Sequence, residues 1–157
     1  MKTLVLGMGN PILSDDAVGI RVVQEVARKL DDPGVTVAES SLAGLGLLDC
    51  VTGYDRVIIV DAIQTEGESA GCIYRMGPED FSCSKRLSAP HQINLITALE
   101  LGRRLNMAMP REITIFAVEA EDIATFSEEC TPAVEQAIPA VVEMVLQEVN
   151  RSPETPG

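Results

Sequence analysis

Three residues of this chain could together bind a metal and activate water: Asp16, Asp61 and His91. Asp16 follows Asp15 after a glycine-containing loop, Asp61 follows an aliphatic run, and His91, the only histidine, follows a proline. Two carboxylates and one neutral imidazole can hold a divalent transition metal and leave coordination positions open. Open positions admit water or a carbonyl oxygen, which metal-assisted hydrolysis requires. This set of residues is therefore compatible with a hydrolase.

Each of these residues also has an ordinary structural interpretation. Ser14 or Asp15 can cap the helix that follows, where negative charge is favourable. Asp61 can cap the turn after its strand, and a lone histidine at the start of a helix is more often a surface or capping residue. Capping explains one acid of the Asp15-Asp16 pair well and the second acid less well.

Alternating strands and helices are expected to position these side chains. The sequence predicts strands at 3–6, 35–38, 56–61, 71–76 (at an edge) and 112–118, and helices at 16–30, 44–51, 91–105 and 132–150. Thr131 is the expected N-cap of the last helix, with Pro132 as its first residue. We predict an α/β fold, a three-layer sandwich with a mostly parallel, twisted sheet of about five strands flanked by helices. Ligands of such sheets bind beyond the C-terminal ends of the strands, where the three residues can converge.

The loop from Gly7 to Gly19 invites comparison with a dinucleotide-binding fingerprint. The third glycine of G-x-G-x-x-G would fall at Ile12, and Pro11 interrupts the motif. Two carboxylates at the start of the next helix would also repel a pyrophosphate. A Rossmann-like nucleotide-binding module therefore stays a minor alternative.

Composition limits the class of protein. The 157 residues suit one domain at 1–150, followed by a tail at 151–157 that we expect to be disordered. A net charge of −12 disfavours nucleic acid as a partner. The N-terminal apolar stretch is too short for a signal peptide, and no apolar run is long enough to span a membrane. We expect a cytoplasmic monomer that is not bound to a membrane.

The four cysteines do not form a metal-binding or redox pattern. Cys50, Cys72, Cys83 and Cys130 include no C-x-x-C pair and no cysteine–histidine cluster. Free, buried thiols are the favoured interpretation, with a structural zinc or a redox pair as the alternatives.

Four motifs resemble those of the hydrogenase maturation protease family. They are Leu4–Pro11 followed by Asp15, Asp16 and Gly19; Tyr54–Ala62; Ser88–His91; and Thr131-Pro132. The motifs occur in the family's order, with compatible spacing, over nearly the whole chain. One segment differs, because many relatives have an Asp-Gly-Gly-Thr-like sequence where this chain has Glu39-Ser40-Ser41-Leu42. That difference leaves the cognate hydrogenase open.

The resemblance implies a specific activity. Asp16, Asp61 and His91 would be the metal ligands, with glutamate or aspartate accepted at the first position. The protein would be a nickel-dependent endopeptidase that removes the C-terminal extension from a [NiFe]-hydrogenase large-subunit precursor after nickel insertion. The precursor would supply the nickel, although other divalent metals can occupy such a site. The same three ligands would also suit a non-catalytic nickel sensor or chaperone for hydrogenase assembly.

Other protease classes fit less well. The chain has neither H-E-x-x-H nor G-x-S-x-G, which disfavours an ordinary zinc protease and a serine hydrolase. No cysteine neighbours His91 in the sequence, although a thiol nucleophile stays open. Either a carboxylate, Asp16 or Asp61, or the metal could activate water, so both aspartyl-type and metal-assisted cleavage are compatible with the sequence.

Overall fold

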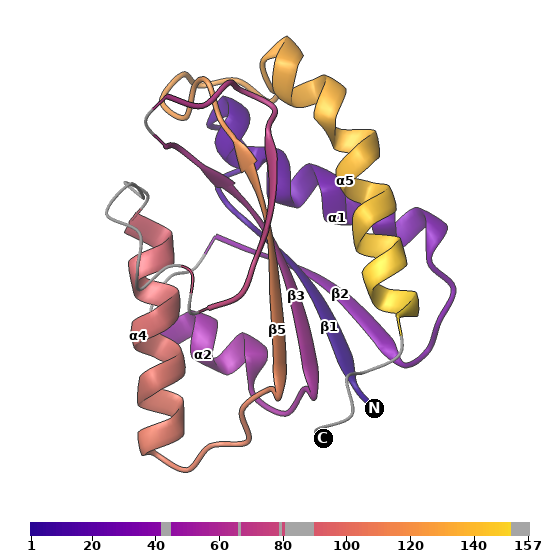
Figure 1. Ribbon diagram of the computed structural model, residues 1–157, viewed down its shortest axis with the longest axis vertical. Helices are drawn as coiled ribbons and strands as arrows, with labels where there is room; N and C mark the ends of the chain where they lie inside the picture. Colours follow the sequence, from indigo (N-terminus) through magenta and orange to yellow (C-terminus); the bar gives the residue numbers. More distant parts are fainter. Residues whose placement is uncertain (42–44, 66, 79, 81–89, 152–157) are drawn as a thin grey trace.

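One five-stranded sheet forms the centre of the protein (Figure 1). The computed structural model describes residues 1–41, 45–65, 67–78, 80 and 90–151, without the side chains of residues 45 and 90–96. The strands are β1 (Thr3–Met8), β2 (Val35–Ser40), β3 (Arg56–Ile63), β4 (Ile73–Met76) and β5 (Glu112–Glu119). Their order is β2-β1-β3-β5-β4, and only the edge strand β4 runs antiparallel to its neighbour.

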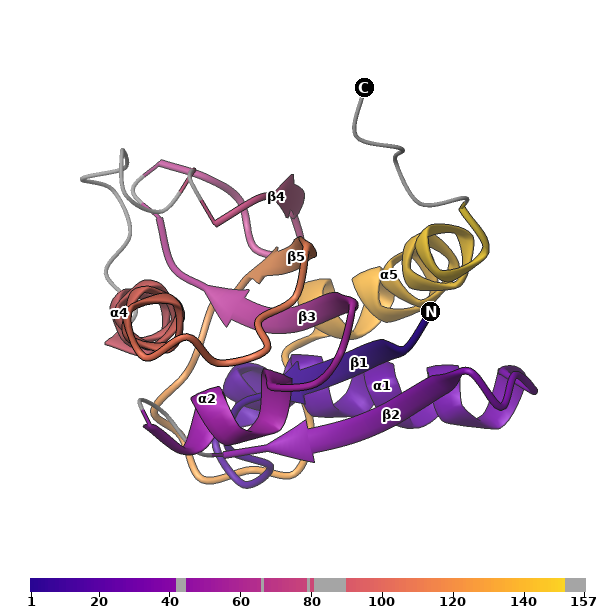
Figure 2. The ribbon, with the colours of Figure 1, turned by 90° about the horizontal axis from the view of Figure 1, so that it is seen from below.

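Helices cover both faces of the sheet, which makes three layers (Figure 2). A 3₁₀ turn, η1 (Ser14–Ala17), leads into α1 (Val18–Lys29), and α1 packs with α5 (Pro132–Asn150) on one face. The other face carries α2 (Leu45–Val51) and α4 (Pro90–Arg104). The predicted three-layer α/β sandwich is therefore confirmed. No described helix is long and apolar enough to cross a membrane.

Strand pleating divides the aliphatic core between the two faces. Ile58 and Val60 of β3 pack against α1 and α5, whereas Val57 and Ile59 pack on the side of α2 and α4. Because successive side chains of a strand alternate between faces, Asp61 lies on the face of α2 and α4. Each fully buried valine, leucine or isoleucine stabilises the fold by about 1.5–3 kcal/mol.

The strand order creates a switch point between β1 and β3. From β1 the chain crosses to β2 on one side of the sheet, and the next strand, β3, pairs with β1 on the other side. Loops that leave neighbouring strands in opposite directions open a crevice at the C-terminal ends of those strands, where α/β proteins bind their ligands. Figure 1 shows that the N-terminal end of α4 lies at the same end of the sheet.

Each predicted strand and helix has a counterpart among the described residues, with different boundaries. Strand β3 continues to Ile63, so Asp61 lies inside a strand rather than at its end, and it pairs with Ala117 of β5. The helix expected from residue 16 is divided into η1 and α1. At the other terminus, Arg151 donates hydrogen bonds to Glu112 and Glu148, and residues 152–157 lie outside the described part of the chain.

Candidate functional site

The glycines after β1 let the backbone of η1 and α1 approach the sheet closely. A Cβ atom on Gly9 would lie 1.9 Å from the Asp16 carbonyl oxygen, and Gly9 has a φ of +143°. A Cβ atom on Gly19 would lie 2.2 Å from the Val60 carbonyl oxygen. Only glycine avoids these clashes, so close packing against β1 and β3 explains the glycine pattern without a nucleotide.

The backbone N–H groups of this loop are all used inside the protein. Gly9 donates to the Ser40 carbonyl, Asn10 to Asp16 Oδ2 and Ile12 to Asn10 Oδ1. The next four N–H groups donate to backbone carbonyls, namely those of Asn10, Ser127, Asp122 and Leu13. A phosphate-binding loop needs N–H groups that point at its ligand. This geometry therefore argues against the nucleotide-binding interpretation.

Asp15 is a buried hydrogen-bond acceptor that holds three segments together. It is 0% exposed. Its Oδ1 accepts the Thr131 N–H at 2.7 Å, and its Oδ2 accepts the Thr131 hydroxyl and the N–H groups of Glu121 and Asp122 at 2.7–3.0 Å. The carboxylate thus ties the segment after β1 to the β5–α5 loop and to the start of α5.

Two capping predictions are corrected by this arrangement. Neither Ser14 nor Asp15 caps α1, because the N-cap position of α1 is Ala17 and no side chain caps it. Thr131 does occupy the N-cap position of α5, and Pro132 follows it, but the Thr131 hydroxyl donates to Asp15 instead of capping the helix. The two neighbouring acids therefore have different roles. Asp15 accepts hydrogen bonds from the β5–α5 loop, and Asp16 faces the switch point.

Asp16 and Asp61 form a pair of buried carboxylates at the switch point. Asp16 is 6% exposed, and its Oδ2 accepts the Asn10 N–H at 3.0 Å. Asp61 is 3% exposed, and its Oδ1 accepts the Ala62 N–H at 2.8 Å. Burial raises the pKa of Asp61 well above its ordinary value; the Ala62 hydrogen bond opposes that shift, and the charge of Asp16 adds to it. The two carboxylates are therefore close enough to repel each other.

The third predicted ligand, His91, is placed by its backbone alone. It is the second residue of α4, whose N-terminal end lies toward the C-terminal edge of the sheet (Figure 1). Its side chain lies outside the described part of the chain. Among the side chains that are described, no three histidine, cysteine or acidic residues form a metal-binding group. The structure thus brings Asp16 and Asp61 together and leaves the imidazole to experiment.

The described cysteines are free thiols. Cys50, Cys72 and Cys130 are free, as expected, and they are partly buried. Burial and the charge of Asp15 raise the pKa of Cys130 to about 11, which keeps this thiol protonated at neutral pH. Cys83 lies outside the described residues.

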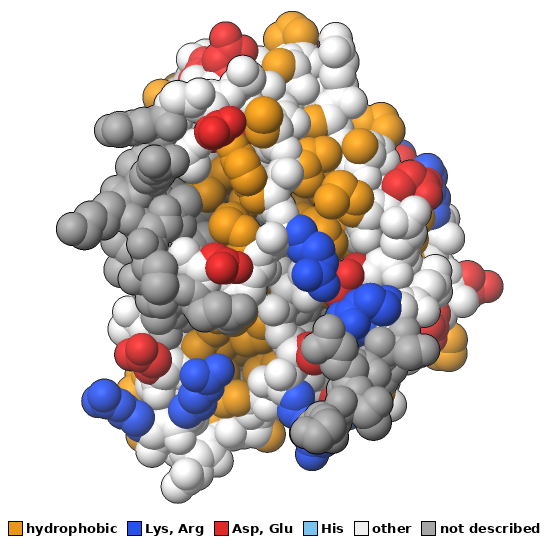
Figure 3. All heavy atoms as spheres, in the orientation of Figure 1, with side chains coloured by type: hydrophobic (Ala, Val, Ile, Leu, Met, Phe, Trp, Pro, Cys, Tyr) orange, Lys and Arg blue, Asp and Glu red, His pale blue; other side chains and the backbone are white. Residues whose placement is uncertain are grey.

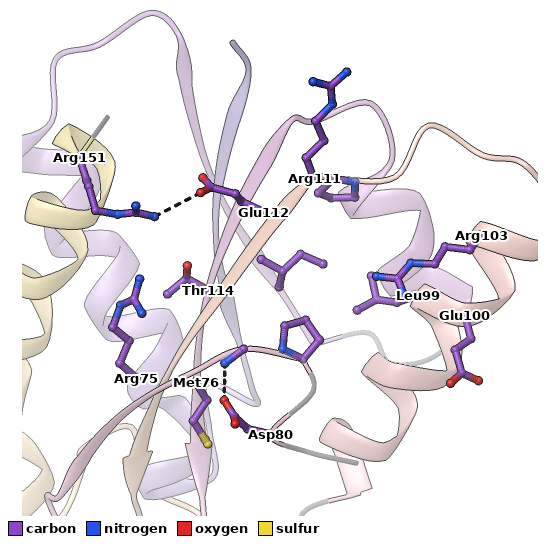
Figure 4. Close-up of a pocket in the computed structure, with 14 residues that line it drawn as sticks. Arg75, Met76, Asp80, Leu99, Glu100, Arg103, Arg111, Glu112, Thr114 and Arg151 are labelled. Atoms are coloured by element: carbon purple, nitrogen blue, oxygen red, sulfur yellow. Dashed lines mark hydrogen bonds and ion pairs between the residues drawn. The ribbon is translucent and has the colours of Figure 1, made fainter. Parts of the chain in front are cut away.

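A hollow of about 610 Å³ lies away from the paired carboxylates, between the start of β5 and α4 (Figure 4). It is lined on one side by Arg75 and Arg151 and on the other by Arg103. Arg75 and Arg151 both pair with Glu148, and Arg151 also pairs with Glu112. Because β5 is parallel to β3, its first residues lie at the N-terminal ends of these strands, and the switch point lies at their C-terminal ends. The hollow and the carboxylate pair are thus separate features.

The segment that differs from many relatives borders the loop after β1. The Ser40 carbonyl accepts the Gly9 N–H at 3.1 Å, and Glu39 Oε1 accepts a hydrogen bond from Gln24 Nε2 at 2.8 Å. Residue 42 and the two that follow it lie outside the described part of the chain.

The fold and the paired carboxylates define an α/β protein with an acidic site at its switch point, and the comparisons identify the family. The sequence profile of the family described as "Hydrogenase maturation protease" matches residues 20–148. The chain is 30% identical to the hydrogenase 2 maturation protease of Escherichia coli (strain K12) over 155 residues, which cover 97% of this chain and 93% of the relative. The chain therefore belongs to the hydrogenase maturation protease family, and it is a hydrolase of the endopeptidase class.

Solved structures agree with this assignment. The hydrogenase maturating endopeptidase HybD from Escherichia coli superimposes with a TM-score of 0.82 at 29% identity, covering 96% of this chain and 93% of that one. The [NiFe] hydrogenase maturation protease HybD from Thermococcus kodakarensis superimposes with a TM-score of 0.74 at 23% identity, covering 94% and 99%. The second likeness supports the fold alone.

Proposed function

We propose that this endopeptidase removes the C-terminal extension from the large-subunit precursor of a [NiFe] hydrogenase after nickel has been inserted. The observation that carries the proposal is the pair of buried carboxylates, Asp16 and Asp61, at the switch point of the sheet. Burial and mutual repulsion make two negative charges unfavourable there, and a divalent cation relieves both costs. His91 is the proposed third ligand.

The donor set suits a metal that arrives with the substrate. Two carboxylates and an imidazole without a thiolate form an open site, which we expect to hold metal weakly in the isolated protein. Nickel carried by the precursor would then be recognised together with the peptide to be cut, and other divalent metals could bind in its place. Stoichiometric zinc that survives purification without added metal would contradict this expectation.

The paired acids also suit the hydrolytic step. A carboxylate within hydrogen-bond reach of a water molecule can accept its proton, and the raised pKa of Asp61 favours that role for its carboxylate. Asp16, held by the Asn10 N–H, would keep its orientation while the substrate binds. Either role is compatible with a metal that polarises the scissile carbonyl.

The partner and the compartment follow from the proposal. The partner is the large-subunit precursor, and we propose that the protein acts as a monomer. The sequence favours the cytoplasm, where the precursor would be processed.

Mass spectrometry of matched precursors tests the proposal. Nickel-loaded and nickel-free large-subunit precursors are incubated with the purified protein, and the intact mass of each is followed over time. We expect only the nickel-loaded precursor to be shortened, because the metal contributes both recognition and electrophilic assistance. Equal cleavage rates would contradict nickel dependence. Complex formation without shortening would favour the nickel sensor or chaperone.

A further inference from the structure

Two exposed apolar side chains border the loop that carries Asp16. Phe126 is 80% exposed and Ile12 is 48% exposed. Phe126 is one of only three phenylalanines in the chain, which has no tryptophan. Single exposed apolar residues are ordinary, whereas adjacent ones held beside a functional site indicate a binding surface.

The backbone places these two residues side by side although they are far apart in the sequence. Leu13 and Ser127 form a parallel bridge. The Ser127 N–H donates to the Ile12 carbonyl at 2.9 Å, and the Ser14 N–H donates to the Ser127 carbonyl at 3.0 Å. Ile12 and Phe126 come immediately before the bridged residues, so their backbones are neighbours.

A set of hydrogen bonds keeps this arrangement in place. The Asp15 carboxylate accepts the N–H groups of Glu121, Asp122 and Thr131. Asp122 Oδ1 in turn accepts the N–H groups of Ala124 and Thr125, both at 2.9 Å, so the segment leading to Phe126 is internally bonded. A surface that is already ordered loses little conformational entropy when a partner binds, which favours affinity.

The surface is continuous with the candidate site. Ile12 lies in the loop whose Asn10 N–H holds the Asp16 carboxylate, and Leu13 and Asp16 share a backbone hydrogen bond. In Figure 1 the loop after β1 and the loop after β5 lie together at the end of the sheet where β1 and β3 terminate. A polypeptide brought to Asp16 would therefore pass next to Ile12 and Phe126.

We propose that Ile12 and Phe126 form an apolar docking pad for the precursor polypeptide, which receives an apolar side chain near the bond to be cut. The proposal rests on the proposed function above. A second copy of this chain is a poorer occupant, because the net charge is −12 and the exposed Glu121, Glu128 and Glu129 near the pad would face like charges. The pad contributes binding rather than chemistry.

Kinetics with nickel-loaded precursor test the pad. Phe126→Ser is expected to raise KM about tenfold with kcat unchanged, because the phenyl ring is desolvated only when substrate binds. Ile12→Ser should raise KM by a smaller factor. Phe126→Leu, which keeps an apolar side chain, should leave KM close to the wild-type value. Leu105→Ser is the matched control, since Leu105 is 59% exposed just after α4, at the far end of that helix from the site.

The outcomes separate the pad from the activity. If the wild-type protein shortens the precursor and Phe126→Ser does so with wild-type KM, the pad is overturned and the proposed function stands. If the precursor is bound but not shortened, the function fails, and equilibrium binding of the same variants decides the pad: weaker binding by Phe126→Ser supports it and equal binding overturns it. Self-association that Phe126→Ser abolishes would assign the pad to a second copy and overturn the proposal.

Discussion

Two acidic regions of this protein differ in the groups that stabilise their carboxylates. At and beside the switch point, Asp15, Asp16 and Asp61 are buried, and each accepts a hydrogen bond from at least one backbone N–H group. Beside the hollow between β5 and α4, Glu112 and Glu148 are neutralised by arginine side chains. Figure 3, drawn in the orientation of Figure 1, shows that the basic side chains on the visible face gather mainly over its lower half.

The difference supports the switch point as the proposed reactive site. Arginine–carboxylate pairs stabilise a surface and leave the carboxylates with a counter-charge already in place. Carboxylates that accept hydrogen bonds from backbone N–H groups keep their negative charge available for a cation or a proton. We therefore interpret the hollow as a feature of the surface and propose the acidic switch point as the place for chemistry.

Neutralising Asp61 should have the largest effect on activity. Asp61→Asn is expected to reduce processing of nickel-loaded precursor by about 10³-fold or more, and Asp16→Asn and His91→Ala should do the same. The rate of precursor shortening measures the effect. Glu143→Gln, an exposed acid on α5, is the control. Full cleavage by any one of the three variants would remove that residue from the site.

The stability of the Asp61→Asn variant tests whether Asp61 serves activity or the fold. An acid whose pKa is raised by folding destabilises the protein as pH rises through that raised pKa. The amide removes this cost, so the free energy of unfolding at neutral pH should be unchanged or higher. The sequence predicted that the strand ends at Asp61, whereas β3 continues to Ile63. Unfolding of the variant would show that Asp61 serves the fold.

Removing Asp15 should affect stability more than any single change beside the hollow. Asp15→Ala leaves three partly buried backbone N–H groups without their acceptor, so we expect the free energy of unfolding to fall by roughly 2–4 kcal/mol. Denaturant unfolding measures it. Asp122→Asn, a change to a more exposed acid of the same loop, should cost less. A loss below that of Asp122→Asn would contradict the role of Asp15 as the centre of the loop.

Glu148 should show a smaller, pH-dependent effect. Burial opposes its charge, but hydrogen bonds from Arg75 and Arg151 outweigh burial and lower its pKa. Its contribution is therefore present above the ordinary glutamate pKa of about 4.3 and is lost as pH falls through the lowered value. Because the Arg75 side chain is 52% exposed, we expect Glu148→Gln to cost at most about 1 kcal/mol at neutral pH. Thermal unfolding should show the difference between variant and wild type shrinking in acid; a constant difference would contradict this.

The smallest effect is expected inside the hollow itself. Arg103 lines it from α4 and forms no ion pair with another described residue. Arg103→Ser should leave precursor shortening within about twofold of the wild-type rate, as for an ordinary surface change. A loss as large as that of Asp61→Asn would move the candidate site to the hollow.

Local sequence patterns determined much of this structure. The β-branched run before Asp61 predicts a strand buried on both faces, because only residues shielded by helices on each side can be continuously apolar. Pro132 marks the start of the last helix, since its fixed φ and missing N–H suit that position. The four family motifs point to the same activity as the comparisons. Each of these signals depends on residues close together in the chain.

Only the tertiary structure decided how the neighbouring acids divide their roles. Asp15 and Asp16 are adjacent and chemically identical, yet one accepts hydrogen bonds from residues 121, 122 and 131 and the other lies beside Asp61. The pairing of Leu13 with Ser127, which places Ile12 beside Phe126, is equally invisible in either segment alone. Hydrogen bonds that span more than a hundred residues depend on how the sheet brings its loops together. Secondary-structure propensity and hydrophobic periodicity depend on residues that are close in the sequence, so they do not predict those contacts.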